Sequence, residues 1–420
     1  MAKPKFTTHT GMVDILPDEA HKWHYVESVI RKTARLFHFQ EIRTPIMEPT
    51  ELIARGVGQL TDIVSKEMFA FDRGDDHYVL RPEGTAPVAR AFVEHNLQQR
   101  GGTQNLFYIG PMFRAERPQK GRQRQFHQFG AEVIGADDPF ADAQVIAFMM
   151  HIYKEIGVKN MTLKINSVGD PESRKAYKSA LQEYFKPHFE KLSETSQERY
   201  EKNPMRILDS KDEQDQPFLK DAPSILDYLN EDCEEHYAKV KSHLELLGID
   251  YKEDDRLVRG LDYYTKTAFE LTSTDLGSQD ALGGGGRYDL LIEEIGGQKT
   301  PAVGFASGIE RLMIACEALN LPLGEPEQPD VYIVCWGEKA RLWALEHQPE
   351  FHKKGISCMI ELAGKSMKAQ MKDANRNNAR FAVIVGEDEL EKGEFTLRDM
   401  KSSEEEMVSL SKILEKLSAE

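Results

Sequence analysis

Residues 105–135 constrain the fold most, because their pattern predicts two strands on either side of a basic loop. Side chains alternate across a strand, so each strand presents two different faces. One face carries Phe107, Ile109 and Phe113, then His127, Phe129, Ala131 and Val133. The other carries Tyr108, Met112, Arg114 and Glu116, then Phe126, Gln128, Gly130 and Glu132. Polar groups on one face suggest a ligand platform, although an ordinary solvent-facing side fits the pattern equally well.

The chain around these two strands predicts helices and short strands. Apolar residues recur at helical spacing in residues 19–37 and 85–97, while 41–44 and 78–83 have an extended pattern. Residues 171–250 are helical and acidic, which indicates an inserted helical subdomain. Strand-like sequence resumes at Leu257. The four glycines at 283–286 either let the backbone approach a ligand closely or form a tight turn, and the run taken alone favours the turn. A helix follows from about residue 308 to 319.

A linker rich in Pro, Gly and Glu, LPLGEPEQP at residues 321–329, predicts a domain boundary. Beyond it we expect strand 331–336, helix 339–353, strand 356–361, helix 366–378, strands 381–386 and 395–399, and helix 404–417. Strands that alternate with helices are typical of a small α/β domain. Because 420 residues are too many for one core, we expect one domain at 1–325, with the insertion at about 171–250, and another at 329–420.

Composition narrows the classes of protein. No apolar run approaches the ~18 residues of a membrane span, and the first residues lack a signal-peptide core, so we expect a cytoplasmic protein without a membrane partner. The four cysteines are far apart, which fits a reducing compartment and argues against a zinc cluster. A net charge of -16 counts against nucleic-acid binding. However, Lys and Arg cluster at 114–124 and 351–380, and such local clusters can hold a nucleic acid on an acidic protein. The cluster at 351–380 can instead be the solvent-facing side of a helix.

Two segments carry groups suited to a nucleotide. Arg114 ends the first strand beside the basic loop, where a guanidinium can hold phosphate oxygens and stabilise developing charge. Phe126 offers a flat face on which a base can stack. Arg311 lies one turn into the helix at 308–319, whose N-terminus favours an anion. The sequence has no GxxxxGK[ST] motif, which argues against a P-loop ATPase.

Two further motifs bring polar groups together. In RPEGT, residues 81–85, Glu83 and Thr85 suit an α-ammonium group, but helix capping by Thr85 is the explanation that the motif alone favours. In LVRGLDYYT, residues 257–265, one Arg, one Asp and two Tyr lie within six positions. Arg259 could neutralise a phosphate and a carboxylate, and Tyr264 could donate to a ring nitrogen. Strand alternation does not decide whether Tyr263 or Tyr264 faces a pocket.

Together these segments closely resemble the histidyl-tRNA synthetase family of class II aminoacyl-tRNA synthetases, nearly end to end. TPIMEPTEL with its preceding helix is similar to motif 1, FRAERPQKGRQRQFHQFGAE to motif 2 and GFASGIERLM to motif 3. RGLDYYT and GGGGRYD resemble the two signatures that separate the histidine enzymes from other members of the class. His38 departs from the class pattern, which has glycine there. The implied α+β fold has an antiparallel-sheet catalytic domain with a helical insertion, plus a C-terminal α/β anticodon-binding domain.

The resemblance also implies residue roles. Arg114 would grip the α-phosphate of ATP and Arg311 the γ-phosphate, while Phe126 would stack on adenine and Glu116 would contact adenine or hold the loop. Arg259 would stand where related enzymes place a metal ion, which makes Arg259 and Arg114 the catalytic pair. No residue is expected to ligate a metal directly, and Mg²⁺ would bind mainly through the ATP phosphates. Histidine would be held by Glu83, Thr85, Gln128, Glu132, Tyr263, Tyr264 and Tyr288.

The resemblance predicts a histidine–tRNA ligase whose partners are ATP, L-histidine, tRNA(His) and a second copy of the chain in a homodimer. Two alternatives stay open. One is a regulatory paralogue that binds histidine without catalysis, and the other is a sensing module of a larger regulatory protein. Such paralogues usually lack the anticodon domain and the motif arginines, whereas Arg114, Arg259, Arg311 and a domain after residue 329 are all present here.

Overall fold

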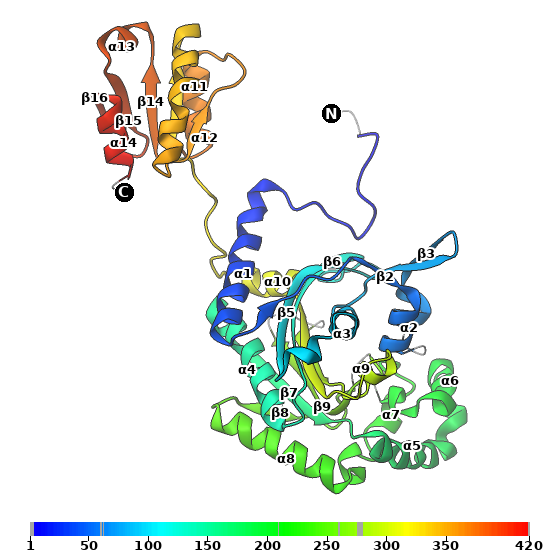
Figure 1. The fold of residues 1–420 in the computed structure, drawn as a ribbon. Coiled ribbons are helices and arrows are strands. Elements are labelled where there is room, and N and C mark those ends of the chain that lie inside the picture. The colour runs from blue at the N-terminus through cyan, green and yellow to red at the C-terminus, as the bar shows by residue number, and fades with distance from the viewer. Residues whose placement is uncertain are drawn as a thin grey trace. The chain divides into compact units, whose positions relative to one another are not determined.

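The computed structural model describes residues 4–58, 61, 63–208, 210–258, 261–274 and 280–418, and the chain divides into two compact units after Gly324. The first unit is built on an eight-stranded sheet (Figure 1). In sheet order its strands are β1 (Gln40–Glu41), β5 (Gln104–Phe113), β6 (Gln125–Ile134), β11 (Ala302–Gly308), β10 (Ala281–Arg287), β9 (Thr265–Ser273), β7 (Met161–Ser167) and β8 (Tyr251–Glu253). Its pairs are antiparallel except at the two edges, β1 with β5 and β7 with β8.

Helices cover both faces of this sheet (Figure 1). One face packs against α1 (Pro17–Leu36), α4 (Pro139–Ile156), α8 (Glu231–Leu246) and α10 (Ile309–Ala318), whose apolar residues share a core with Phe129, Ala131 and Val133. The other face packs against α3 (Thr85–Glu94) and α9 (Leu291–Glu294), in a second core that includes Tyr108 and Met112. The two predicted faces of β5 and β6 are therefore confirmed, and the face with the polar groups is covered rather than open to solvent.

A small antiparallel sheet of β2 (Met47–Pro49), β4 (Asp76–Leu80) and β3 (Phe69–Arg73) precedes the main strands. The remaining short elements there are α2 (Thr50–Val57), the π-helical turn η1 (Ile63–Glu67) and η2 (Leu97–Arg100). The expected extended segment at 41–44 forms only the short β1. Strand-like sequence was also expected from Leu257, but β9 begins at Thr265, because Leu257 closes a turn by donating its N–H to Asp254 O at 2.9 Å.

The segment expected to be an insertion consists of two parts with different packing. The helices α5 (Pro171–Phe185), α6 (Glu194–Lys202), η4 (Pro204–Ile207), α7 (Gln216–Leu219) and η5 (Ile225–Tyr228) share a core of their own, while η3 (Lys186–Lys191) between α5 and α6 buries no residue. This core includes Tyr177, Leu181 and Phe185. In contrast, α8 packs on α4 and contributes Tyr237 and Val240 to the core of the main sheet. The independent helical cluster therefore ends before α8.

The second unit is a five-stranded sheet with helices on both faces. Its order is β13 (Cys358–Ile360), β12 (Val331–Cys335), β14 (Phe381–Val385), β15 (Phe395–Asp399) and β16 (Glu405–Val408), parallel among the first three and antiparallel beyond. The helices are α11 (Glu338–Lys353), α12 (Met367–Arg376), α13 (Glu387–Lys392) and α14 (Leu410–Ser418). None of the helices in the described part of the chain has the length and apolar character that a membrane crossing requires.

One prediction for this unit was wrong, and one helix was missed. The helix expected at 404–417 divides into β16 and α14, because residues 405–408 pair with β15 and complete the sheet edge. The glutamates of β16 suggested a helix because glutamate is uncommon in strands. Such residue preferences are a weak guide where a neighbouring strand is available for pairing. The short helix α13 was not predicted at all. It begins where Gly386 N–H donates to Glu389 Oε2 at 2.9 Å.

Candidate active site

A fully buried carboxyl group, that of Glu132, lies at the centre of the candidate site. It accepts hydrogen bonds from two hydroxyl groups, Thr85 Oγ1 at 2.8 Å and Tyr288 OH at 2.7 Å. Burial raises its pKa to about 8, although these two hydrogen bonds oppose the shift. At pH 7 the carboxyl is therefore mostly protonated. A buried group of this kind can exchange its proton for a hydrogen bond from a polar ligand.

The Thr85 hydroxyl does not cap its helix, so the explanation favoured by the short motif alone was wrong. Glu83 caps α3 instead, because its buried carboxylate accepts from Thr85 N–H and Ala86 N–H, both at 2.7 Å. Burial raises the pKa of Glu83, and the two amide hydrogen bonds oppose that rise. The cap leaves the Thr85 side chain directed at Glu132. A local pattern could not reveal this, because the acceptor lies 47 positions along the chain.

Three tyrosine rings cluster beside the Glu132 carboxyl, which one of them, Tyr288, contacts. The ring centroid of Tyr263 lies 4.7 Å from that of Tyr264 and 5.7 Å from that of Tyr288. All three side chains are buried in the core that covers this face of the sheet. The sequence left open which tyrosine of the adjacent pair faces the pocket, and the structure brings both into this aromatic cluster.

Two buried polar atoms in the site lack a hydrogen-bond partner among the described residues: the Tyr108 hydroxyl and Gln128 Oε1. Their side chains are 5% and 8% exposed. Buried polar groups are nearly always paired, so such atoms point to a polar ligand. Tyr108 was not among the predicted site residues. Its signal was its place on the polar face of β5, next to Gly84 and Gly130, where any side chain would overlap the tyrosine ring or hydroxyl.

Two of the predicted nucleotide-binding residues, Arg114 and Phe126, lie together, and Arg114 is close enough to Glu83 to feel its charge. Arg114 donates from Nε to Pro82 O at 3.0 Å, and its guanidinium lies 5.2 Å from the centroid of Phe126. Burial lowers the pKa of Arg114, while Glu116 is the carboxylate that most raises it. Glu116 itself pairs with Arg122 in the basic loop at 3.2 Å. Arg114 and Phe126 are therefore brought together beside the carboxyl groups of the pocket.

Arg311 fixes the basic loop to the sheet. It donates from Nε to Gly121 O at 3.2 Å and from Nη1 to Ala281 O at 2.6 Å. Burial lowers the pKa of Arg311, and the nearby charge of Arg122 lowers it further. Two guanidinium groups, Arg311 and Arg122, therefore lie at the same loop. Arg259, the other predicted catalytic residue, lies outside the described residues.

Comparison with known proteins decides the family. The family model of histidyl-tRNA synthetase matches residues 11–312, and that of the anticodon binding domain matches residues 330–420. The chain belongs to the histidyl-tRNA synthetase family. A histidine–tRNA ligase of Chloroherpeton thalassium is 48% identical over 99% of this chain and 98% of its own. One of Desulforamulus reducens is 49% identical over 97% and 98%.

Solved structures agree with this family. The crystal structure of apo histidyl-tRNA synthetase from S. aureus superposes with a TM-score of 0.83 and 39% identity, covering 98% of this chain and 100% of that one. An ATP phosphoribosyltransferase regulatory subunit/histidyl-tRNA synthetase from Bacillus halodurans is 24% identical with a TM-score of 0.65, which supports the fold alone. The match of an anticodon binding domain at 330–420 disfavours the regulatory paralogue that the sequence left open.

In this synthetase the four glycines at 283–286 form a strand, so the predicted tight turn was wrong. They lie in β10, which pairs with β9 on one side and β11 on the other. Side chains would not fit there: one at Gly285 would overlap Gly304 O, and a Cβ at Gly286 would lie 2.8 Å from the Tyr264 ring. The glycines therefore allow close approach of neighbouring strands and of a pocket tyrosine, rather than a change of direction.

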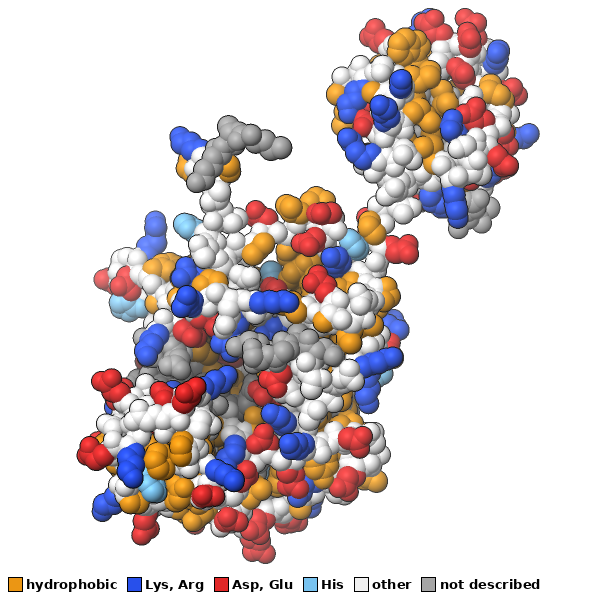
Figure 2. All heavy atoms as spheres, turned by 180° about the vertical axis from the view of Figure 1, so that it is seen from behind, with side chains coloured by type: hydrophobic (Ala, Val, Ile, Leu, Met, Phe, Trp, Pro, Cys, Tyr) orange, Lys and Arg blue, Asp and Glu red, His pale blue; other side chains and the backbone are white. Residues whose placement is uncertain are grey.

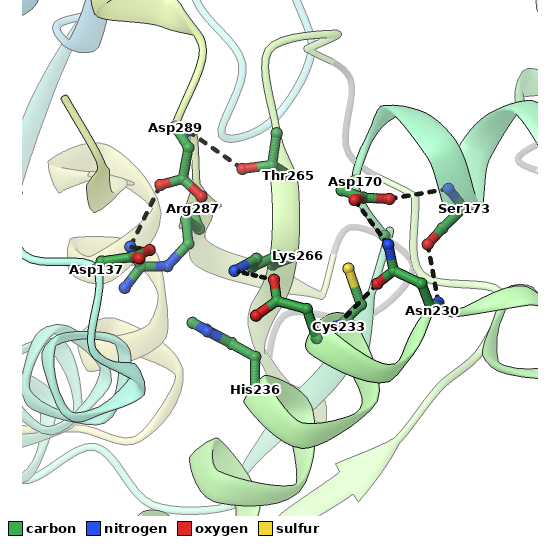
Figure 3. A network of polar contacts seen from close by, with 12 residues as sticks. Asp137, Asp170, Ser173, Asn230, Cys233, His236, Thr265, Lys266, Arg287 and Asp289 are labelled. Carbon is green, nitrogen blue, oxygen red and sulfur yellow. Dashed lines mark hydrogen bonds and ion pairs between the residues drawn. The ribbon is translucent and has the colours of Figure 1, made fainter. Parts of the chain in front are cut away.

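The strand β10 ends in a buried ion network that the sequence did not predict (Figure 3). Arg287 is fully buried and pairs with the equally buried Asp142, and it contacts Asp289 at 3.3 Å. His236 Nε2 lies 3.3 Å from Asp142 Oδ1. Burial alone would raise the pKa of Asp142, but the Arg287 charge and these hydrogen bonds lower it to about 2. The network anchors the residue next to Tyr288, whose hydroxyl reaches Glu132.

Proposed function

We propose that the pocket around Glu132 binds the histidine side chain in this histidine–tRNA ligase. The enzyme joins histidine to tRNA with ATP, as its full-length relatives do. The observation that carries the pocket assignment is the fully buried Glu132 carboxyl between two hydroxyl donors. An imidazole N–H of histidine can donate to the Glu132 carboxylate once the carboxyl group has lost its own proton. A ligand that lacks that N–H would deprive the buried, deprotonated carboxylate of a third hydrogen-bond donor, which costs free energy.

The neighbouring groups suit the remaining atoms of histidine. Tyr263 and Tyr264 provide aromatic faces against the imidazole, and Gln128 Oε1 offers an acceptor to the α-ammonium group. The Glu83 carboxylate adds negative charge beside that group, even though its oxygens already accept two main-chain N–H donors. Tyr108 contributes a hydroxyl that can pair with either end of the amino acid.

Arg114 and Arg311 are proposed to hold the phosphates of ATP, with adenine against Phe126 and Glu116 supporting the loop. The histidine carboxylate then attacks the α-phosphorus, the bond to the bridging oxygen breaks, and pyrophosphate leaves. Arg259 would stabilise the charge that develops at the phosphorus. Mg²⁺ enters with ATP as part of the substrate. The described residues contain no cluster of three His, Cys, Asp or Glu side chains that could hold it independently.

In the second step the terminal ribose hydroxyl of tRNA(His) attacks the carbonyl of the adenylate, and AMP leaves. The unit after Gly324 is proposed to bind the anticodon, as its family match suggests. A homodimer belongs to the same proposal, supported by the exposed apolar side chains of Ile46 and Met47 in the segment that resembles motif 1. A cytoplasmic location fits the free thiols of all four cysteines.

The decisive experiment is ATP–pyrophosphate exchange with each of the twenty amino acids in turn, in which only histidine should support exchange. Glu132→Gln should raise the apparent KM for histidine about 10- to 100-fold, which corresponds to the ~1.5–3 kcal/mol of a hydrogen bond to a charged group. The KM for ATP should change by less than about threefold. Thr85→Ser keeps the hydroxyl and is the matched control. Equal effects of Glu132→Gln on both constants would refute the pocket assignment.

Arg259 needs its own test because it lies outside the described residues. Arg259→His should reduce histidine-dependent exchange by orders of magnitude while leaving thermal unfolding unchanged. Such a loss is typical when a group that acts mainly in the transition state is removed. Unchanged exchange would exclude the proposed role.

A further inference from the structure

The strand β9 contains an irregularity directly after the clustered tyrosines. Over residues 283–286 of β10 the ladder with β9 is regular, and it ends with Gly286 opposite Ala268. The next residue of β10, Arg287, lies opposite Thr265, whereas a regular ladder would place Thr267 there. Two residues of β9 are therefore extra at this point, and they form a β-bulge.

This bulge decides which side chain of the segment comes opposite Tyr288. Residues that lie opposite each other in an antiparallel pair point to the same face of the sheet. A ladder without the bulge would place Lys266 opposite Tyr288, whose hydroxyl donates to Glu132. With the bulge, the same register places Tyr264 there, and its ring lies against Gly286. The bulge therefore replaces an ammonium group by a tyrosine beside the buried carboxyl.

Lys266 has an unusual backbone conformation that forms the bulge. Its φ is +48°, in the left-handed region that residues other than glycine, asparagine and aspartate seldom occupy. Neighbouring main chain holds it there, because Lys266 N–H donates to Gly169 O at 2.9 Å and Val168 N–H donates to Lys266 O at 2.7 Å. Just before the bulge, Arg174 Nη1 donates to Tyr264 O at 3.1 Å. Such a conformation costs free energy and persists where the surrounding contacts enforce it.

The Lys266 side chain is held away from the tyrosines. Its Nζ pairs with Asp232 Oδ2 at 2.8 Å, on the helix α8 that packs on the opposite face of the sheet, near Cys233 and His236 (Figure 3). Acidic and basic side chains are mixed over the larger unit in the view of Figure 2, and ion pairs between exposed groups contribute little. Lys266 differs because its side chain is only 13% exposed. Burial alone would lower its pKa, but Asp232 raises it, so the ammonium stays charged.

We propose that Lys266 is a positioning residue for histidine binding: its left-handed bulge and its pair with Asp232 place Tyr264 beside Glu132 and keep an ammonium group away. The proposal rests on the proposed function, because it assumes that Glu132 receives the imidazole. An ammonium next to Glu132 would pair with the carboxylate in place of the imidazole N–H. It would also repel a protonated imidazole. Loss of the bulge should therefore weaken histidine binding and leave ATP binding unaffected.

The test compares Lys266→Asn with Lys266→Val in the full-length enzyme. Both variants remove the ammonium, but asparagine enters the left-handed region readily and a β-branched residue does not. Histidine binds the bulged form, so its apparent KM rises as that form becomes less populated. In pyrophosphate exchange, the KM for histidine should be about tenfold higher in Lys266→Val than in Lys266→Asn, while the KM for ATP should agree within about twofold. If Lys266→Val does not fold, Lys266→Ala against Lys266→Gly makes the same comparison.

A double-mutant cycle with Tyr264→Phe shows whether Lys266 acts through Tyr264. If it does, adding Lys266→Val to Tyr264→Phe should raise the KM for histidine by less than about threefold, because the effects of coupled residues are not additive. Lys266→Arg keeps the charge that pairs with Asp232 and should restore the KM for histidine of the wild type.

Two results would overturn the proposal. One is an equal KM for histidine in the asparagine and valine variants, and the other is a parallel rise of both constants with a fall in Tm, which indicates a general loss of structure. Failure of the proposed function is a separate outcome, because it would appear in the wild type as exchange that does not depend on histidine.

Discussion

The raised pKa of Glu132 makes the stability of the enzyme depend on pH in a way that can be attributed to one residue. The ordinary glutamate pKa of 4.5 applies to the unfolded chain, and burial raises the folded value to about 8. Below pH 4.5 both states hold the proton. As pH rises from 4.5 to 8, the unfolded chain releases it while the folded protein retains it. The free energy of unfolding should therefore fall across this window and level off above pH 8.

Glu132→Gln removes the titration while preserving the shape of the protonated side chain. A pKa difference of about 3.5 corresponds to about 5 kcal/mol, and most of it is expressed between pH 5 and pH 8. The difference in unfolding free energy between wild type and Glu132→Gln should therefore change by about 3 kcal/mol over that range. The wild type should be the form that loses stability as pH rises.

The assay is urea unfolding at pH 5, 6, 7 and 8. The free energy is taken from the unfolding transition whose midpoint moves to higher urea concentration when histidine is added. That choice identifies the unit that contains the pocket, since a ligand stabilises the state it binds. Glu172→Gln, an exposed residue of α5, controls for the loss of one negative charge. If the curves of wild type and Glu132→Gln run parallel from pH 5 to 8, the carboxyl is not desolvated as described.

Three further variants test packing around the site. Gly304→Ala should abolish histidine-dependent exchange, because its Cβ would overlap the pocket carboxyl, whereas Gly308→Ala, whose Cβ has its nearest neighbour at 3.9 Å, should retain exchange. Arg287→Met should lower the free energy of unfolding by about 3–5 kcal/mol, because the buried Asp142 carboxylate loses its arginine and keeps only His236. Asp137→Ala, 75% exposed and 4.0 Å from Arg287, should change it by less than about 0.5 kcal/mol. Asp215→Ala should speed amide hydrogen exchange in the insertion, since three serine hydroxyls and one main-chain N–H donate to that carboxylate.

Local rules predicted the parts of this fold that local geometry determines. The alternation of side chains along a strand correctly placed Phe129 and Glu132 on opposite faces of β6, because successive side chains point to opposite faces in any strand. The helix that carries Arg311 was predicted within one or two residues at each end. The same rules failed at residues 405–408, where pairing with a strand determines the conformation. They failed again at residues 283–286, where glycine indicates close packing between strands rather than a turn.

The candidate site shows the same division. The resemblance named Glu132, Thr85 and Tyr288, but no local pattern could show that their side chains form one hydrogen-bonded unit, since they come from three distant segments. Tyr108 was overlooked because a tyrosine on a sheet is unremarkable until its unpartnered hydroxyl is known to be buried. Arg287 was overlooked because an isolated arginine is usually exposed. Its burial depends on Asp142, 145 positions away in the chain.

These residues explain together how one strand can support a selective pocket. Arg287 and Tyr288 are neighbours at the end of β10, so one is fixed by the buried ion network while the hydroxyl of the other meets Glu132. The glycines at 84, 130 and 304 remove side chains where Tyr108 and Glu132 need space. The site therefore consists of main chain at the glycines and of polar side chains that hydrogen bonds and ion pairs outside the site hold in position. A site that hydrogen-bonds its substrate in this way can reject analogues without the matching N–H by roughly 10⁴–10⁵, so accuracy would follow from binding alone.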